Sequence, residues 1–241
     1  MLFLALMLSV PLACAQDGQQ PPVRVAGQDR DGNAPGPLDV LLADNFDDAE
    51  LGLLPQFSPN PAYDRGYDEG EYFIRKLDPE FTRLPLGVIP GSYGDTMLAI
   101  DARIVGESEG RYIALECRRS ATGWYRAYVD TTQGRFWLAR WDGDDEILLT
   151  ERMPSDAIAA GDEVNHLELT CAGNVVGLGA NGTELANVQD GTYSAGGLAI
   201  GASVFTTSRN TVEARFDNLV VYEAAAPMSE QRSELAPRAS S

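Results

Sequence analysis

The chain has 241 residues, of which 44% are hydrophobic, so it is long enough to bury a full core. Its formal net charge at pH 7 is −18. A field of this sign repels the phosphate backbone of nucleic acids and the anionic head groups of lipids, so we expect no nucleic-acid partner. Cations, neutral polymers and basic proteins remain compatible partners.

Residues 1–15 have the character of a signal peptide. The unbroken apolar run over residues 2–8 is too short to span a bilayer but suits the apolar centre of a secretion signal. Leu12-Ala13-Cys14 followed by polar residues is typical of a bacterial lipoprotein signal, whereas Ala13-Cys14-Ala15 also fits simple signal cleavage. Two interpretations therefore stay open for this exported protein: a cell-surface lipoprotein tethered by a lipid on Cys14, and a secreted protein from which Cys14 is removed.

The two ends of the chain predict disorder. Residues 16–39 are rich in Gln, Gly, Pro and Asp and poor in apolar residues, so they cannot offset the entropy of ordering and are expected to form a flexible linker. Residues 224–241 have the same character and are expected to form a disordered tail. The sequence therefore predicts one folded domain over residues 40–223.

Within this domain, polar and apolar residues alternate in short runs separated by Gly, Asp and Asn, which is typical of an antiparallel β-sandwich. About eleven strands are expected on this pattern. The clearest are residues 97–105, 111–119, 124–131, 135–141, 146–152, 164–171, 175–180, 197–205 and 212–222.

Three dipeptides predict tight turns between strands, because they readily adopt positive φ angles: Gln133-Gly134, Asp142-Gly143 and Asn181-Gly182. Only residues 155–160 predict a helix, a single turn capped by Ser155. In the last predicted strand, the apolar parity changes at Asp217-Asn218, which indicates a β-bulge.

Cys117 and Cys171 each lie on the apolar side of a strongly alternating segment. Both are therefore predicted to point into the core, and an even pair of cysteines in an oxidising compartment predicts a disulfide. The bridge would close a loop of about 55 residues and stabilise the fold by about 4 kcal/mol in the chain-entropy model. The alternative is a pair of buried thiols that act as small hydrophobic side chains.

A family resemblance rests on the order of several short segments: residues 112–118, 124–129, 135–140, 164–167, 180–183 and 215–219. This order resembles the concanavalin A-like, laminin-G-like jelly-roll domains of bacterial envelope proteins, over roughly residues 41–222. The resemblance implies an all-β fold, a two-sheet antiparallel jelly-roll sandwich. It also implies relatives that often bind glycans, sometimes hold structural calcium and sometimes hydrolyse polysaccharides.

The hydrolases among these relatives carry paired glutamates on one strand, commonly Glu-x-Asp-x-x-Glu, and the sequence contains no such run. We therefore expect a protein that is not an enzyme. Glycoside cleavage needs two carboxyl groups that flank one bond, and Glu116 and Glu168 are the only pair that could share a sheet face. Solvated charges paired across strands account for these two residues more simply, as a solvated sheet face accounts for the single histidine, His166.

Strand parity predicts an aromatic and polar face on the side of the strands opposite the core. Flat aromatic rings beside hydrogen-bonding groups suit sugars, which present apolar C–H faces and hydroxyl groups. The expected partner is a glycan or cell-envelope polysaccharide, and the alternative is that loops or residues 55–86 cover these rings as a second core. The candidate carbohydrate-binding residues are Tyr112, Arg118, Trp124, Arg126, Tyr128, Trp137 and Trp141, with Glu116 and Arg135 on the same face.

A weaker candidate site concerns calcium. Asp44 and Asp47 near the start of the domain could meet Asp217 near its end if the terminal strands pair, and carboxylates with backbone oxygens suit calcium. Local capping and bulge hydrogen bonds account for the same residues without an ion and are favoured. The acidic run over residues 142–146 is likewise predicted to be a solvated hairpin turn.

The sequence thus favours an exported, non-catalytic β-sandwich module that binds extracellular carbohydrate. Two alternatives stay open. One is a structural or protein-interaction domain on a flexible stalk. The other is a divergent glycoside hydrolase built around Glu116 and Glu168.

Overall fold

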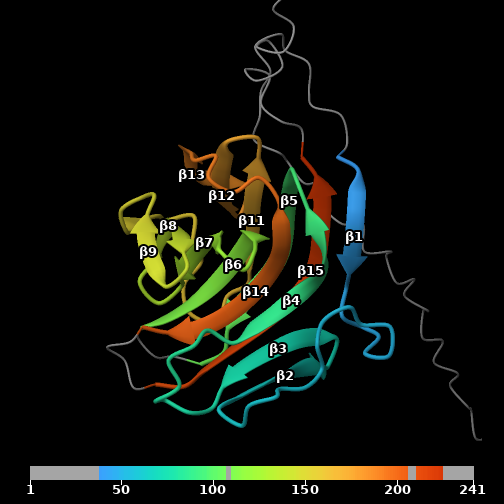
Figure 1. Cartoon of the computed structure of the whole chain (residues 1–241). Coiled ribbons are helices and arrows are strands. Elements are labelled where there is room, and N and C mark those ends of the chain that lie inside the picture. The colour runs from blue at the N-terminus through green and yellow to red at the C-terminus, as the bar shows by residue number, and fades with distance from the viewer. Residues whose placement is uncertain (1–37, 107–109, 206–209, 225–241) are drawn as a thin grey trace, which may run out of the picture.

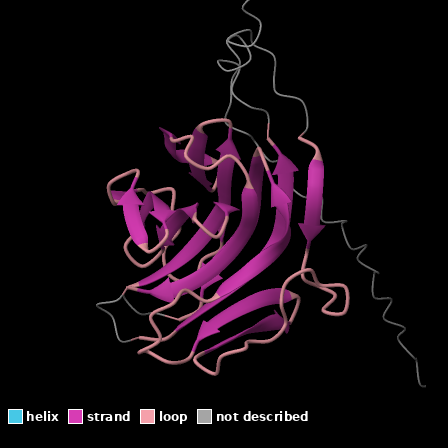
Figure 2. Cartoon of the chain, viewed as in Figure 1, coloured by secondary structure: helices cyan, strands magenta, loops and turns pink. Residues whose placement is uncertain are grey.

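The computed structural model describes residues 38–106, 110–205 and 210–224, which form two antiparallel sheets packed face to face (Figure 1). Strands and the loops that join them account for these residues, as Figure 2 shows. Within the described ranges, no helix is long and apolar enough to cross a membrane. The predicted signal peptide with Cys14, most of the predicted linker and nearly all of the predicted tail lie outside the described residues.

The first sheet, called sheet A, has the strand order β13-β12-β11-β5-β15-β3-β2, and β1 pairs with β15 beside this path. The pairing of β1 with β15 joins the first and last strands of the described domain. The strands of sheet A are β1 (Val40–Asp44), β2 (Tyr63–Asp68), β3 (Glu71–Lys76), β5 (Thr96–Ile104), β11 (Asn165–Ala172), β12 (Val175–Ala180), β13 (Thr183–Gln189) and β15 (Val212–Glu223).

The second sheet, called sheet B, has the order β10-β8-β7-β6-β14-β4, and β9 pairs with β8. Its strands are β4 (Leu86–Tyr93), β6 (Arg111–Arg119), β7 (Gly123–Asp130), β8 (Arg135–Asp142), β9 (Asp145–Leu148), β10 (Met153–Pro154) and β14 (Gly196–Val204). The chain passes from one sheet to the other six times, first between β3 and β4 and last between β14 and β15. This is the predicted jelly-roll sandwich.

The core lies between the sheets and is built by alternation. Along β11, Leu167, Leu169 and Cys171 are buried, while His166 and Glu168 between them are only half-buried. The inward side chains of both sheets form one continuous apolar cluster. Burial of these side chains is the main favourable contribution to folding, at roughly 25 cal/mol for each Å² of apolar surface removed from water.

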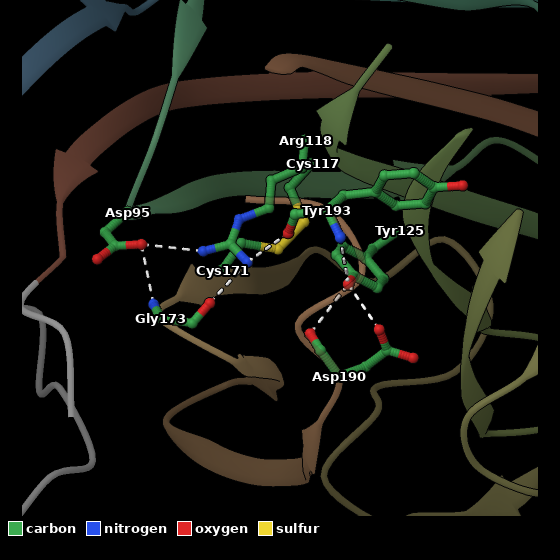
Figure 3. Close-up of a disulfide and its surroundings, with 8 residues drawn as sticks. All are labelled: Asp95, Cys117, Arg118, Tyr125, Cys171, Gly173, Asp190 and Tyr193. Atoms are coloured by element: carbon green, nitrogen blue, oxygen red, sulfur yellow. Dashed lines mark hydrogen bonds and ion pairs between the residues drawn. A yellow bond between two sulfur atoms is a disulfide. The ribbon is translucent and has the colours of Figure 1, made fainter. Parts of the chain in front are cut away.

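A disulfide joins the sheets across this core. Cys117 lies on β6 of sheet B and Cys171 on β11 of sheet A (Figure 3). Their Cα atoms are 6.6 Å apart. Both side chains are buried. The predicted bridge is confirmed, and the alternative of two free thiols is wrong.

Most of the predicted strands are present, with ends that differ by no more than one residue from those observed. The exception is residues 146–152, where β9 already ends at Leu148. The dipeptide Asn181-Gly182 forms the predicted turn, with φ angles of 51° and 77°. The predicted bulge in β15 is also confirmed, because its register with β5 shifts between Asp217 and Val220.

The predicted helix over residues 155–160 is wrong. These residues form a turn in which the Ala157 N–H donates to Ser155 Oγ and the Ile158 N–H donates to the Ser155 carbonyl. The side chain of Asn165 accepts a hydrogen bond from the Ala159 N–H at 2.8 Å and donates one to the Ala159 carbonyl at 3.0 Å. A residue outside the segment therefore satisfies the backbone that a helix would have satisfied, and Ile158 packs into the core.

Replacement of both Cys117 and Cys171 by Ala is expected to lower the free energy of unfolding by about 4 kcal/mol, because the bridge no longer restricts the unfolded chain. The two cysteines are 54 positions apart, so the loop that is released is long. Urea unfolding measures the change, with the native chain under reducing conditions as the matched control. If the native chain and the double variant unfold at the same urea concentration under oxidising conditions, the bridge contributes nothing.

Candidate functional site

A groove of about 690 Å³ lies on the outer face of sheet B. Strand alternation builds its floor, because β7 and β8 turn one set of side chains, such as Ala127 and Leu138, toward the core and the alternate set outward. The loop before β4 and the residues that follow β14 and β9 supply the walls. The outward residues that line the floor are Tyr112, Trp124, Arg126, Tyr128, Trp137 and Trp141.

The rings of the groove form two pairs across strands β7 and β8. Trp124 lies opposite Trp141, with ring centroids 5.8 Å apart and planes 8° from parallel. Tyr128 lies opposite Trp137, with centroids 4.5 Å apart and planes 11° from parallel. The second pair is nearly sealed, since only 4% of Tyr128 and 2% of Trp137 is exposed. Trp124 and Trp141 are half-buried, so the first pair is the accessible one.

A buried carboxylate organises the arginines of this face. Glu116 is fully buried, and its oxygens lie 2.5 Å from Arg126 and 2.6 Å from Arg119. The two guanidinium groups are thereby held over the tryptophans, with Arg126 4.8 Å from the Trp141 ring and Arg119 4.5 Å from the Trp124 ring. Cation–π contacts of this kind stabilise the stack by about 0.5–2 kcal/mol each, depending on exposure.

A chain of hydrogen bonds continues from Arg126 across the groove. Arg126 Nη1 donates to the hydroxyl oxygen of Tyr128 at 3.0 Å, and Trp141 Nε1 donates to the same oxygen at 3.1 Å. The Tyr128 hydroxyl then donates to Glu146 Oε1 at 2.5 Å. Burial raises the pKa of Tyr128, and although burial lowers the pKa of Arg126, the charge of Glu116 raises it to a net value above the usual one. Both groups therefore keep their protons at neutral pH.

Arg118, which parity predicts on this face, does not lie there. A β-bulge shifts the register of β6 against β14, and Arg118 has a φ angle of 52°. Its buried guanidinium turns to the end of the sandwich beside the disulfide, where it donates to the carbonyls of Gly173 and Tyr193 and pairs with Asp95 at 2.9 Å (Figure 3). Arg119 takes the place on the groove that parity assigned to Arg118.

One residue of the sequence, Gly196, is required by this bulge. Gly196 lies against the bulged backbone, and a Cβ atom there would lie 2.4 Å from the carbonyl carbon of Arg118. Only glycine allows so close an approach, but glycine is common at strand ends, where it also serves turns and ordinary loops. The bulge could therefore not be placed from the sequence alone.

The other predicted residues of the face are brought together as expected, with Arg135 at the rim of the groove. Among the groove residues that sequence reasoning missed, four have large cationic or aromatic side chains: Arg83, Arg119, Arg152 and Phe205. Three of these lie outside the strands, where alternation gives no direction. Residues 55–86 do not cover the rings as a whole, because most of them form β2, β3 and their loops in sheet A, and only residues 82–86 reach the groove.

Glu116 and Glu168, the carboxylate pair considered for glycoside cleavage, lie on different sheets. Glu116 is on β6 of sheet B, whereas Glu168 is on β11 of sheet A. Each side chain alternates with core residues of its own strand, so the whole core separates them. A retaining or inverting hydrolase needs two carboxyl groups within about 5–9.5 Å of each other, and the hydrolase model based on this pair is wrong.

The acidic residues near the domain ends serve local hydrogen bonds. Asp44 accepts from the Phe46 and Leu53 N–H groups and from the Tyr67 hydroxyl, while Asp217 accepts from the N–H group of Asn218. The side chain of Asp47 accepts from Asn45. No group of three or more His, Cys, Asp or Glu side chains in the described ranges is placed to hold a metal ion. Local hydrogen bonds, the favoured interpretation, thus involve all three of these residues in the structure.

His166 lies on the outer face of sheet A and is not simply solvated. Its Nδ1 is 2.6 Å from Asp101 Oδ1, and its Nε2 is 3.6 Å from Glu168 Oε1. The hydrogen bond with Asp101, supported by Glu168, raises the pKa of His166 to about 9. The imidazole is therefore charged at neutral pH and forms an ion pair.

The acidic run at residues 142–146 forms the predicted hairpin turn. Asp142 at the end of β8 lies opposite Asp145 at the start of β9 in the antiparallel ladder, and Gly143 has a φ angle of 62°. Glu146, which follows the turn, is the residue that reaches the groove and accepts from Tyr128.

Comparison with known proteins identifies the fold and nothing finer. No protein-family model and no curated protein sequence matches the chain. Among solved structures, the chain is similar to a Bacillus subtilis protein of unknown function with a galectin-like fold, at 10% identity and a TM-score of 0.57 over 78% of this chain and 97% of that one. It is also similar to LamAcat from Zobellia galactanivorans, at 11% identity and a TM-score of 0.54 over 76% and 97%.

A third similar structure is the β-glucanase of Bacillus licheniformis, at 11% identity and a TM-score of 0.53 over 76% of this chain and 97% of that one. These structures share the concanavalin A-like jelly-roll sandwich, so the predicted fold class is confirmed. Identities this low establish the architecture alone.

Substitution of Glu116 by Gln is expected to lower the free energy of unfolding by about 3–5 kcal/mol, because Arg126 is then buried without its carboxylate. Chemical denaturation measures the effect. Glu146→Gln is the matched control, since Glu146 is an exposed carboxylate of the same face. Equal, small losses in the two variants would show that the buried pair does not hold this face together.

The stability of the protein is expected to fall as the pH rises through about 9, where His166 loses its proton. The folded-state pKa lies above the ordinary value of 6.5, so the stabilisation is complete below pH 6.5 and lost through pH 9. Its size is on the order of 1 kcal/mol, because the pair is partly exposed to water. Unfolding of the native chain and of His166→Gln across this range tests the effect, and parallel curves for the two proteins would contradict it.

Proposed function

We propose that the chain is an exported, non-catalytic module that binds carbohydrate in the groove of sheet B. The observation that carries the proposal is the composition of the groove, which gathers all three tryptophans of the chain, Tyr112 and Tyr128 around a space of about 690 Å³. Flat rings beside fixed hydrogen-bond donors are the chemistry that sugars require. A volume of this size is in the ordinary range of small-ligand sites, about 300–1,000 Å³.

The half-buried pair Trp124 and Trp141 is the platform that a sugar ring would contact. Trp137, in contrast, is covered, because only 2% of the residue is exposed. Trp141 also donates its indole N–H to the Tyr128 hydroxyl, which fixes the orientation of the ring before any ligand arrives. A preorganised platform loses little entropy on binding.

The contacts of the groove carboxylates support a binding role over a catalytic one. Glu116 beneath the groove is held by two arginines, and two of the three carboxylates that line it, Asp130 and Glu146, accept hydrogen bonds from the Gln133 N–H and the Tyr128 hydroxyl. Asp144 is the third. A glycosidase needs one carboxyl group free to donate a proton and a second one free to attack or to activate water. The fold itself carries no argument on this point, because the same architecture hosts binding modules and hydrolases.

The disulfide between Cys117 and Cys171 supports export, because such bonds persist in oxidising compartments and are rare in the cytosol. The proposal covers both forms of export that the N-terminal sequence allows, a lipid tether on Cys14 and release after signal cleavage.

A second candidate function, that of a structural or protein-interaction domain, is favoured by one observation. Tyr128, Trp137 and Ala139 form a small buried cluster of their own, packed by Tyr112 and Phe205. Aromatic rings sealed in this way also serve as a second core that stiffens sheet B. The two functions differ in whether Trp141 matters for a ligand.

Replacement of Trp141 by Ala is expected to lower glycan affinity about tenfold or more, since truncation of a central aromatic contact typically costs about 2 kcal/mol or more. The full chain is screened on an array of neutral and charged glycans, and the affinity for the best binder is measured by calorimetry. Phe57→Ala is the matched control, because Phe57 is 73% exposed and lies outside the groove.

Two results would contradict the proposal. One is the absence of saturable binding to any glycan on the array. The other is a correctly folded Trp141→Ala protein with the affinity of the native chain. Either result would favour the structural or protein-interaction role.

A further inference from the structure

The groove gathers positive charge in a protein whose net charge is −18. Its lining includes three carboxylates, and two of these already accept hydrogen bonds within the protein. Asp130 accepts from the N–H groups of Thr132 and Gln133, and Glu146 accepts from the Tyr128 hydroxyl. The lining arginines outnumber them. They are Arg83, Arg119, Arg126, Arg135 and Arg152.

Three of these arginines differ from the others that the structure describes. Arg83, Arg135 and Arg152 are exposed and make no ion pair or hydrogen bond with the described residues, and all three line the groove. Elsewhere in the described ranges the guanidinium groups are occupied. Arg65 and Arg111 donate to backbone carbonyls, and carboxylates hold Arg75, Arg103, Arg118, Arg119, Arg126, Arg140 and Arg215.

The groove also has a surplus of neutral donors. The indole N–H groups of Trp124 and Trp137 are buried in its lining and have no acceptor among the described residues. Buried donors without partners reduce stability and are uncommon in folded proteins, so a role in binding would account for their retention. The lining of the groove therefore holds more cations than carboxylates, together with two buried N–H donors that have no acceptor among the described residues.

We infer that the groove binds glycans that carry anionic substituents, either carboxylate or sulfate. The inference rests on the proposed function and names its ligand class. Arg135 and Arg152 pair with the anionic groups, because the planar guanidinium fork matches the oxygens of carboxylate and sulfate. The sugar ring lies against Trp124 and Trp141, while Arg83 faces the ligand from the loop before β4.

The acidic surface of the protein limits the range of this attraction. At physiological salt the Debye length is about 8 Å, so the groove arginines act on groups that have already entered the groove. Beyond that distance the net charge of −18 repels polyanions. Binding thus requires the sugar rings to contact the aromatic pair as well as the charges to pair.

The experiment compares pairs of polysaccharides that differ only in charge, with the full chain immobilised. One pair is polygalacturonate and its methyl ester, which tests carboxylate, and the other is κ-carrageenan and its desulfated form, which tests sulfate. The test variant is Arg135→Gln with Arg152→Gln. Arg103→Gln is the control, because it removes a positive charge on sheet A, where Arg103 pairs with Glu71.

At least one charged form is expected to bind about tenfold or more tightly than its neutral partner, since hydrogen bonds to charged groups exceed the roughly 1.4 kcal/mol that tenfold represents. The preference is expected to disappear in the double variant, to persist in the control, and to weaken as salt rises from about 0.1 M to about 1 M. The pair that shows the preference identifies the anionic group.

The outcomes separate this inference from the proposed function. Binding that is equal for charged and neutral forms, or limited to neutral glycans, overturns the anionic class and leaves carbohydrate binding intact. A charge preference that survives in the double variant also overturns it, because the assigned arginines then play no part. Absence of binding to all four polysaccharides and to every glycan of the array overturns both.

Discussion

The alternation of side chains along β6, β7 and β8 is the constraint on which both the core and the groove depend. The same three strands turn Ile113, Ala127 and Leu138 toward sheet A and turn Tyr112, Tyr128 and Trp137 outward. A shift of one residue in any of these strands would exchange the two sets, so burial of the aliphatic side chains fixes the register. The aromatic face is therefore positioned by the packing of the opposite face.

The buried ion pair of Glu116 with Arg126 gives this face its detailed arrangement. Burial of charges costs several kcal/mol per ion, and a hydrophobic pair of the same volume would stabilise a sheet face at least as well. The charged pair instead fixes the orientation of the neighbouring side chains. Arg126 is held over the Trp141 ring and donates to Tyr128, so rings and hydroxyl group are locked in one arrangement. The polar network thus fixes the orientation of the rings more than it adds to stability.

The sequence predicts the parts of the fold that local patterns control. Strands β6 to β8 were predicted to within a residue because alternation alone defines them, whereas β2 and β3 were missed because Asp, Gly and Arg interrupt the pattern over residues 63–76. The misplaced Arg118 and the false helix at residues 155–160 share one cause. In both, a group outside the segment decides the local conformation: β14 and Gly196 at the bulge, and Asn165 at the turn. Arg83 and Arg152 reach the groove only through the tertiary fold.

The distribution of arginines follows from the same distinction between local pattern and fold. The chain has twice as many acidic as basic residues, 36 against 18, so carboxylates are available for every guanidinium group. Most of the described arginines form an ion pair with one. An arginine that stays unpaired in such an acidic environment is therefore informative, since pairing was available at little cost. The three arginines with neither an ion pair nor a hydrogen bond in the described ranges converge on one groove from a loop, a strand end and the segment after β9, and only the folded structure shows that they belong together.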